Sequence, residues 1–406
     1  MYRSRRRRTH EVIVASETPF QRDRLTLTMY GHLAIFGYFL FSFGPAQPLL
    51  RDEQGTSRTV AALHGTALAL GAIIAGLLNT RLTHRFGAER CTWIGMSIAA
   101  IGILDLIIFR SLPFTLLGAL VSGTGGSIAV NGTTSVFHDH LPQKQAEKAL
   151  VEGNSAAGFF GACGTTLIGL LVGTSFGWRG GLIVALAGML AVRLFIYRKP
   201  GQIHIPNPSG HSSGSLPRRF WIGWICIVTA VGIEFASSFW AAALIRVRTG
   251  ASASNSTITV MVLALCMGIG RYLGSRGLHK ASLDRLLILF LILTGLGFSV
   301  FWTANSTAVS FIGLGLIGLG VSMQYPLAIS RLIRLSDHRP DLALGRASLG
   351  AGVAIGSAPL MLGFLGDHIG IQKAYLLVPA MVILGIIAVL SSPTETEVDA
   401  DLEPET

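Results

Sequence analysis

Hydrophobic residues gather into twelve long runs that are separated by short polar stretches. Each run is close to the roughly 20 apolar residues that an α-helix needs to cross a bilayer, so each predicts one membrane-spanning helix. The runs lie near residues 27–47, 60–80, 92–109, 113–136, 150–173, 180–197, 220–245, 256–275, 286–303, 307–333, 343–366 and 374–391. This pattern predicts an all-α integral membrane protein with no large soluble domain.

The runs form two sets of six with a polar segment between them. The pattern predicts five parts: a basic N-terminus (1–26), a six-helix half (27–197), a linker (198–219), a second six-helix half (220–391) and an acidic tail (392–406). Pro, Gly, Ser and His are frequent in the linker, so we expect it to be flexible. The tail carries acids and no basic residue, and we expect it to be disordered.

An internal repeat relates the two halves. When the chain is compared with itself at an offset of 192 residues, three glycines of the fifth run coincide with three of the eleventh: Gly153, Gly158 and Gly164 fall on Gly345, Gly350 and Gly356. Each of these runs is the fifth of its set. A duplicated membrane protein of this kind is expected to hold its substrate site between the halves, near the bilayer midplane.

The distribution of charge sets the topology. The chain has a net charge of +11, only 13% charged residues and a mean hydropathy of +0.57. With the N-terminus inside, 25 of the 32 Lys and Arg residues fall in inner segments. This is positive-inside topology rather than a nucleic-acid-binding stripe, and it predicts that both termini are cytoplasmic. The basic N-terminus is free to touch anionic lipid.

Cysteine and arginine usage adds two smaller points. The four cysteines have no paired spacing, which argues against a disulfide framework or a zinc site. Arg greatly outnumbers Lys, which favours a bacterial source and hence the cytoplasmic (inner) membrane. We expect no metal and no cofactor.

The loop after the second run carries a family resemblance. Residues 80–90 read TRLTHRFGAER and match the pattern Gly-x-Leu-Ala-Asp-Arg-x-Gly-Arg-Arg at Leu82, Arg85, Gly87 and Arg90. Residues 270–276, GRYLGSR, resemble a degenerate second copy, and residues 177–179, GWR, are also familiar. The chain thus resembles the major facilitator superfamily along its whole length. The resemblance implies two pseudo-symmetric six-helix halves, secondary transport by alternating access, and a monomer.

Two departures from the family pattern alter this expectation. His84 replaces the loop Asp that latches the inner side in relatives, and a mostly neutral His weakens that latch. Drug exporters often carry an Arg in the fourth span and a Gly-Pro pair in the fifth. Here the fourth run has no basic residue between Pro113 and Ser135, and the fifth has no proline. These differences argue against a drug exporter without excluding one.

Two acids within the runs are candidates for proton coupling. Glu234 lies in the middle of the seventh run, and Asp105 lies in the outer third of the third. An ionisable group at this depth is costly and is functional by default. For Asp105, the alternative is a carboxylate at the mouth that pairs with Arg110.

Candidates for substrate contact are polar and aromatic residues within the runs. On the first run, residues spaced by 4, 3 and 4 share one helical face. Buried packing and interhelical hydrogen bonds are the alternative use of such groups. The full set comprises His32, Phe36, Phe39, Phe43, His64, Asn131, Glu234, Ser238, Trp240, Gln324 and Tyr325.

A third group of residues is expected to form an inner gate. Glu152 opens the fifth run, while Arg271 and Arg276 close the eighth. We expect an ion pair between the halves there, strengthened by the position of Glu152 at a helix N-terminus. By the internal repeat, the mirror contact joins the loop after the second run to the eleventh run, through His84, Arg85 and Arg346. Solvated charges are the alternative.

These features predict a proton-coupled secondary transporter of a small organic solute. Efflux of a drug-like or metabolic compound is the expected direction. Uptake by proton symport of a small metabolite, such as an organic acid or a sugar, is the alternative. A non-transporting membrane sensor is the alternative from a different class. No catalytic residue is expected, because only residues 138–140, His-Asp-His, resemble metal ligands, and adjacent residues of a helix point in different directions.

Overall fold

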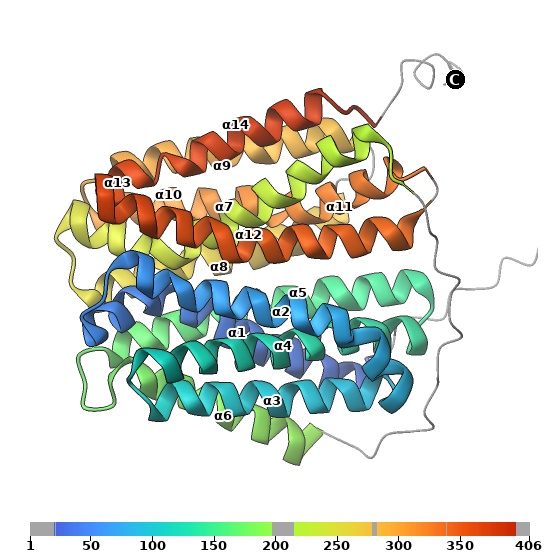
Figure 1. Ribbon diagram of the computed structural model, residues 1–406, viewed down its shortest axis with the longest axis horizontal. Helices are drawn as coiled ribbons and strands as arrows, with labels where there is room; N and C mark the ends of the chain where they lie inside the picture. The colour runs from blue at the N-terminus through green and yellow to red at the C-terminus, as the bar shows by residue number, and fades with distance from the viewer. Residues whose placement is uncertain (1–19, 21, 197–214, 278–281, 338, 395–406) are drawn as a thin grey trace, which may run out of the picture.

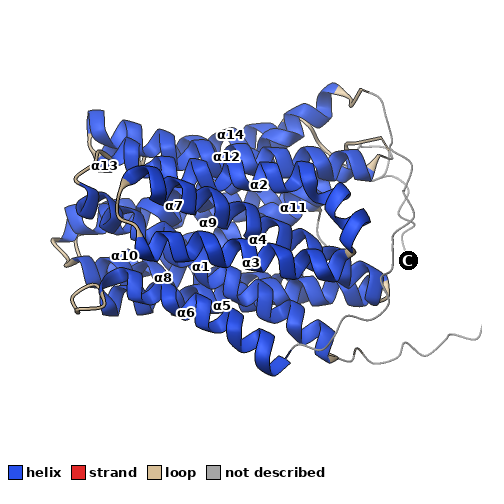
Figure 2. Cartoon of the chain, turned by 60° about the horizontal axis from the view of Figure 1, so that its bottom comes forward, coloured by secondary structure: helices blue, strands red, loops and turns tan. Residues whose placement is uncertain are grey.

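The computed structural model describes residues 20, 22–196, 215–277, 282–337 and 339–394. Most of the predicted basic N-terminus, most of the linker 198–219 and nearly all of the tail 392–406 lie outside these residues. The described chain is helical, with short loops between the helices (Figure 2). It contains twelve helices or helix pairs that are long and apolar enough to span a membrane, which confirms the predicted fold class.

The first half contributes six spans. In chain order they are α1 (Arg24–Gln54), α2 (Arg58–Phe86), α3 (Ala88–Ile108), α4 (Leu112–His140), α5 (Gln143–Leu171) and α6 (Gly177–Ala191), which continues as the π-helix η1 (Val192–Ile196).

The second half also contributes six spans, two of which are divided into two helices. The elements are α7 (Arg218–Thr249), α8 (Ala253–Gly277), α9 (Leu283–Thr303), α10 (Thr307–Ser322), α11 (Gln324–Arg334), α12 (Pro340–Ile369), α13 (Ile371–Ala374) and α14 (Leu377–Leu390).

The tenth span is broken where the hydrophobic pattern predicts one helix. α10 ends at Ser322 and α11 begins at Gln324. Pro326 lies in the first turn of α11, where a proline is tolerated because it has no backbone N–H to donate. The same missing N–H leaves the Ser322 carbonyl, four residues earlier, without its α-helical partner. The break therefore provides a free acceptor inside the bundle.

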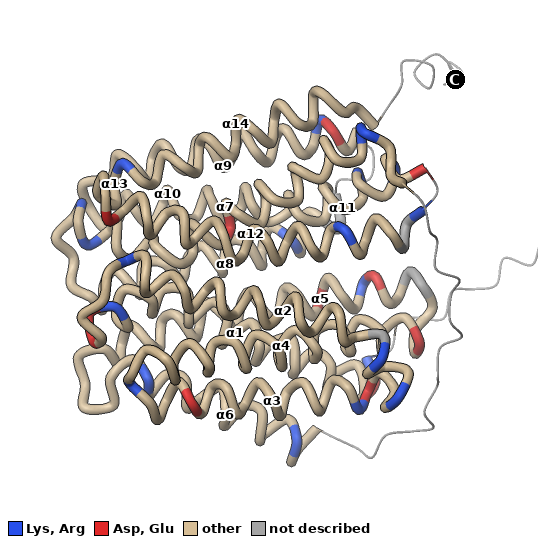
Figure 3. The backbone as a smooth tube through the Cα atoms, viewed as in Figure 1, with Lys and Arg blue, Asp and Glu red and all other residues tan. Residues whose placement is uncertain are grey.

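The two halves lie side by side with their helices running along the same axis (Figure 1). α5 packs against α8, α2 against α12 and α1 against α7. Charged residues gather at the two ends of the bundle and are sparse between them (Figure 3), as an apolar surrounding requires. Following the predicted topology, we call the end where α1 begins the inner end and the opposite end the outer end.

At the outer end, ionic contacts join the halves. The Asp367 carboxylate of α12 accepts hydrogen bonds from the backbone N–H groups of Arg58 and Thr59 in α2, at 3.0 and 2.8 Å. Arg246 of α7 pairs with Asp52 of α1 at 2.8 Å. These contacts join the two halves at the outer end.

The inner end has a different pattern of pairing. Arg22 pairs with Glu152 at 2.7 Å, and Arg219 pairs with Asp337 at 2.8 Å. Each of these pairs joins residues of a single half. Among the described side chains, the ion pairs between the halves thus lie at the outer end.

An aromatic side chain also packs between the two halves, in the outer half of their interface. Phe239 of α7 is buried, and its ring lies against Gly44 of α1 and Gly65 of α2. A Cβ atom at Gly65 would lie 2.8 Å from the ring carbon Cε2 of Phe239. The two halves can approach this closely only because Gly65 has no side chain.

Gly65→Ala is therefore expected to lower the free energy of unfolding by about 1–3 kcal/mol, the usual cost of overpacking a tight contact. Gly76→Ala is the matched control, because Gly76 lies on the same helix and a Cβ there meets nothing within 4 Å. Thermal unfolding of the two variants in detergent checks the prediction. Equal stability of both variants would show that the contact is not tight.

Candidate functional site

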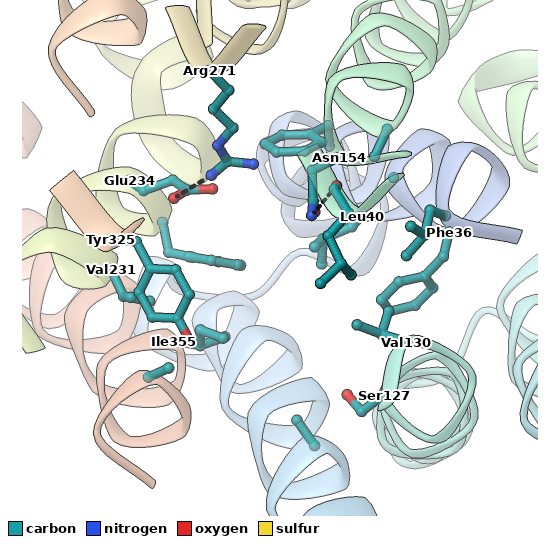
Figure 4. A pocket seen from close by; sticks show the side chains of 18 of the residues that line it. Phe36, Leu40, Ser127, Val130, Asn154, Val231, Glu234, Arg271, Tyr325 and Ile355 are labelled. Atoms are coloured by element: carbon teal, nitrogen blue, oxygen red, sulfur yellow. Dashed lines mark hydrogen bonds and ion pairs between the residues drawn. The ribbon is translucent and has the colours of Figure 1, made fainter. Parts of the chain in front are cut away.

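A cavity of about 450 Å³ lies between the two halves. α1, α2, α4 and α5 form one wall, while α7, α8, α11 and α12 form much of the other. Most of the lining is aliphatic or aromatic, as Figure 4 shows for Phe36, Leu40, Val130, Val231 and Ile355. The polar lining residues are few: Ser127, Asn131, Asn154, Glu234, Arg271 and Tyr325.

One ion pair lies in this cavity wall. The Nη2 atom of Arg271 is 3.6 Å from Oε2 of Glu234 (Figure 4). At that distance the groups attract each other without a hydrogen bond. The two side chains are 18% and 10% exposed, respectively. Their charges are therefore mostly shielded from solvent but border the cavity.

The break in the tenth span positions this arginine. Arg271 Nε donates to the Ser322 carbonyl at 3.3 Å. That carbonyl is the one that Pro326 leaves free, because a proline cannot donate to it. The guanidinium is thus fixed at one edge by the backbone, and its other edge faces Glu234. Sequence reasoning placed Arg271 at the inner surface and did not anticipate its position beside Glu234.

Tyr325 and Gln324 are neighbours with different surroundings. Tyr325 lines the cavity, and its predicted contact with a substrate stays a prediction. The Gln324 side chain is buried and turns to α9, where its Nε2 atom donates to Thr294 Oγ1 at 2.7 Å and to the Phe290 carbonyl at 3.3 Å. Gln324 therefore joins two helices and does not line the cavity.

The first half contributes neutral polar groups to the site. Asn131, a predicted candidate for substrate contact, lines the cavity together with Ser127 and Asn154. Sequence reasoning missed Asn154, whose amide nitrogen donates to the Leu150 carbonyl at 2.8 Å. Its amide oxygen can accept a further hydrogen bond. The signal in the sequence was an amide in the polar start of the fifth run, two residues after Glu152.

The aromatic face of α1 turns mostly away from the cavity. Phe36 lines it, but Phe39 and Phe43 are fully buried and stack on each other with ring centroids 5.5 Å apart. His32 is buried with its ring edge-on to Trp93 at 4.5 Å. These residues pack inside the first half, whereas the α1 residues Leu33, Gly37, Leu40 and Phe41 accompany Phe36 along the cavity.

Three further predicted contact residues serve packing. His64 is buried between the Ala61 carbonyl and Thr115 Oγ1, both at 2.9 Å. The Trp240 indole donates to the Pro359 carbonyl at 3.0 Å, and Ser238 donates to a carbonyl of its own helix. Their polar atoms have protein partners, and none of the three is among the residues that line the cavity.

Asp105, the second predicted proton site, lies outside the cavity lining. It is half-buried on α3 beside Gly118 of α4, where an added Cβ would lie 2.8 Å from its Oδ2 atom. Arg110 pairs with Glu53 at 3.5 Å rather than with Asp105. The structure thus separates the two acids that sequence reasoning grouped together.

The residues of the predicted inner gate have other partners in this structure. Glu152 is bound by Arg22 and by the Tyr30 hydroxyl at 2.8 Å, while Arg271 faces Glu234 at 3.6 Å. The predicted pair between Glu152 and Arg271 is therefore not formed here. The side chain of Arg276 lies outside the described residues.

The mirror contact of the gate is also not formed by described side chains. His84 and Arg85 are exposed, and Arg85 lies over the Phe86 ring at 5.4 Å. Arg346 is exposed over the Trp221 ring at 6.0 Å. We predict that these residues form the gate contact in a different conformation, in which the inner end is closed.

Comparison with known proteins covers most of the chain. The family model described as Major Facilitator Superfamily matches residues 30–283. An uncharacterized MFS-type transporter of Yersinia pestis is 21% identical over 351 residues, which are 84% of this chain and 88% of that protein.

Solved structures share the fold at low sequence identity. A bacterial homolog of the human lysosomal transporter Spinster, in an inward-facing and occupied conformation, has a TM-score of 0.70 at 15% identity and covers 93% of this chain and 97% of its own. A D-xylose-proton symporter has a TM-score of 0.70 at 15% identity, with 92% and 99% covered.

Proposed function

The chain belongs to the major facilitator superfamily, and from this premise we propose that it carries a small organic solute through the central cavity by alternating access, with a proton bound to Glu234. The family and the shared fold support secondary transport. The Glu234–Arg271 pair in the cavity wall is the observation that carries the finer proposal. No other charged residue among the described ones lines this cavity.

The geometry of the pair supports a proton-coupling role. Protonation of Glu234 removes its negative charge and with it the attraction to Arg271. Because no hydrogen bond joins the two groups at 3.6 Å, they can separate without losing one. A carboxyl that borders a cavity is also within reach of protons carried by water. One proton can thus alter the charge that the cavity offers to a solute.

The contacts between the halves at the outer end support alternating access. The contacts of Asp367 with α2 and of Arg246 with Asp52 join the halves there. The corresponding cross-half contact of Glu152 at the inner end is not formed. We propose that these outer contacts break and the inner gate forms when the carrier reorients around its cavity.

Two transport reactions are candidates. The first is efflux of a drug-like or metabolic compound in exchange for protons. The second is uptake of a small metabolite, such as an organic acid or a sugar, together with protons. Arg271 places a fixed cation in the cavity wall, which favours an acid as the solute in either reaction.

Transport by the purified full chain in proteoliposomes tests the proposal. An imposed pH gradient is expected to drive at least one solute from a panel of organic acids, sugars and drug-like compounds. Movement with the proton flow identifies symport, and movement against it identifies antiport. A solute that raises the unfolding temperature by mass action but moves under no gradient would overturn the proposal in favour of a sensor.

A further inference from the structure

We propose that the transported solute is a small organic monoanion with an apolar body, whose anionic group takes Arg271 away from Glu234, so that one proton accompanies each anion. This inference rests on the proposed function, because it takes the central cavity as the transport site. It adds the chemical class of the solute and the stoichiometry of coupling.

The composition of the cavity wall defines the class of ligand. Arg271 is the only cation, and Glu234 the only acid, among the described residues that line the cavity. Three neutral polar residues lie on the opposite half, and the rest of the lining is mostly apolar: Phe36, Leu40, Val130, Val231 and Ile355 are typical. A cavity of about 450 Å³ lies within the ~300–1,000 Å³ range of sites that bury small organic ligands.

Arg271 is prepared to receive an anion. Its Nε atom is held by the Ser322 carbonyl at 3.3 Å, so the guanidinium cannot rotate freely. Its Nη2 atom has only a loose partner in Glu234, at 3.6 Å. A planar guanidinium offers parallel N–H donors that match a carboxylate. An incoming carboxylate can therefore form the close contact with Arg271 that Glu234 does not form.

Charge balance then couples the anion to a proton. The empty site is neutral, because Glu234 and Arg271 carry opposite charges. An anion alone would leave the site with a net negative charge, and a proton alone would leave it positive. A net charge in the middle of a membrane protein is costly. The site is neutral again only when both are bound, so the anion and the proton bind cooperatively and cross together without moving net charge.

The neighbours of the pair do not change this balance. Tyr325 of α11 is the other titratable group that faces Glu234 and Arg271 across the cavity wall. The described residues that α1, α2, α4, α5 and α12 present to the cavity are uncharged. An organic cation would meet Arg271, while a sugar would find few groups to bind its hydroxyls. The monoanion is the class that satisfies both the charge and the apolar lining.

Three matched probes test the inference by binding: phenylacetate, its neutral amide phenylacetamide, and the cation phenethylamine. The readout is the unfolding temperature of the full chain in detergent, at mildly acidic and at neutral pH. We expect phenylacetate to stabilise the wild type, and to do so more strongly at acidic pH, while the amide and the amine have little effect. An equal effect of phenylacetate and its amide would overturn the inference.

Variants of the pair sharpen the test. Arg271→Gln is expected to weaken phenylacetate binding roughly ten- to a hundredfold, the usual loss for a charged hydrogen bond. Arg285→Gln, at an exposed arginine of α9, is the matched control and should bind like the wild type. Glu234→Gln should bind phenylacetate equally well at both pH values, because the glutamine side chain is uncharged at either pH. If Arg271→Gln fails to fold, the Glu234→Gln titration decides alone, and a retained pH dependence there overturns the inference.

Transport separates this inference from the proposed function. In proteoliposomes, proton-driven uptake of phenylacetate without a change in membrane potential supports both. Proton-driven movement of the amide or the amine, but not of the acid, would overturn the inference that the solute is a monoanion. It would leave the proposed transport function intact. A protein that moves no solute in any proton gradient would overturn the proposed function itself.

Discussion

Glu234→Gln is expected to abolish net accumulation of solute in a proton gradient while leaving solute exchange intact. Glutamine has the shape of a protonated glutamate but releases no proton. With the anion bound to Arg271, the variant site is neutral and can reorient. Without the anion it carries the uncompensated charge of Arg271, and returning empty through the membrane is costly. Exchange needs only the first of these movements, whereas net transport needs both.

Two assays on the same proteoliposomes check this prediction. The first measures accumulation driven by an imposed pH gradient, which should fall to the level of vesicles without a gradient. The second measures exchange of labelled for unlabelled solute in the absence of a gradient, which should persist. Gradient-driven accumulation by Glu234→Gln at the wild-type level would remove Glu234 from the coupling mechanism.

Asp105→Asn distinguishes the two acids that the sequence proposes for proton coupling. Since Asp105 lies outside the cavity lining, beside Gly118, we expect this variant to keep gradient-driven accumulation. If gradient-driven accumulation were lost in Asp105→Asn and kept in Glu234→Gln under the same assay conditions, the proton site would have to be assigned to Asp105 of α3.

Arg331→Met is expected to lower the free energy of unfolding by about 3–5 kcal/mol, the cost of leaving a buried charge without its partner. Arg331 of α11 is only 1% exposed and pairs through Nε with Asp284 of α9 at 2.5 Å. Its Nη2 atom donates to the Val389 carbonyl at 2.9 Å and to the Ser392 carbonyl. The side chain thus ties α9, α11 and the end of α14 together at the inner end.

Arg334→Met is the matched control for this prediction, because Arg334 lies one turn further on the same helix and is exposed. Thermal unfolding in detergent should place Arg331→Met well below the wild type and Arg334→Met close to it. The double variant Arg331→Met/Asp284→Asn should lose less than the two single variants together, since neither charge is then left without a partner. Equal stabilities of the two arginine variants would contradict a structural role for the cluster.

Several features of the molecule follow from local sequence alone. A span satisfies most of its backbone hydrogen bonds within its own helix and must be about 20 apolar residues long. Both are properties of one segment, so twelve spans could be read directly from the hydrophobic pattern. Glu234 stood out for a related reason, because a charge within an apolar run is visible without knowledge of its neighbours, and it lines the cavity.

Other features depended on the break in the tenth span. Arg271 of α8 is held beside Glu234 by a hydrogen bond to the Ser322 carbonyl. That carbonyl is free to accept because Pro326, which lies on α11 and not on α8, has no N–H to donate to it. The sequence shows the proline, but it does not show which donor forms a hydrogen bond with the Ser322 carbonyl. For the same reason the sequence indicates a position at the inner surface for Arg271, whereas the structure places it in the cavity wall. Its role in a gate stays a prediction.

What the sequence by itself determined is the number and type of the spans and the presence of an acid in the seventh. What only the tertiary structure decided is which face of each span meets the cavity: Phe36 but not Phe39 or Phe43, and Tyr325 but not Gln324. In water, a polar face and an apolar face mark the outside and inside of a helix. In a membrane, lipid and protein interior are both apolar, so that contrast is lost, and the orientation of each helix is set by packing against its neighbours.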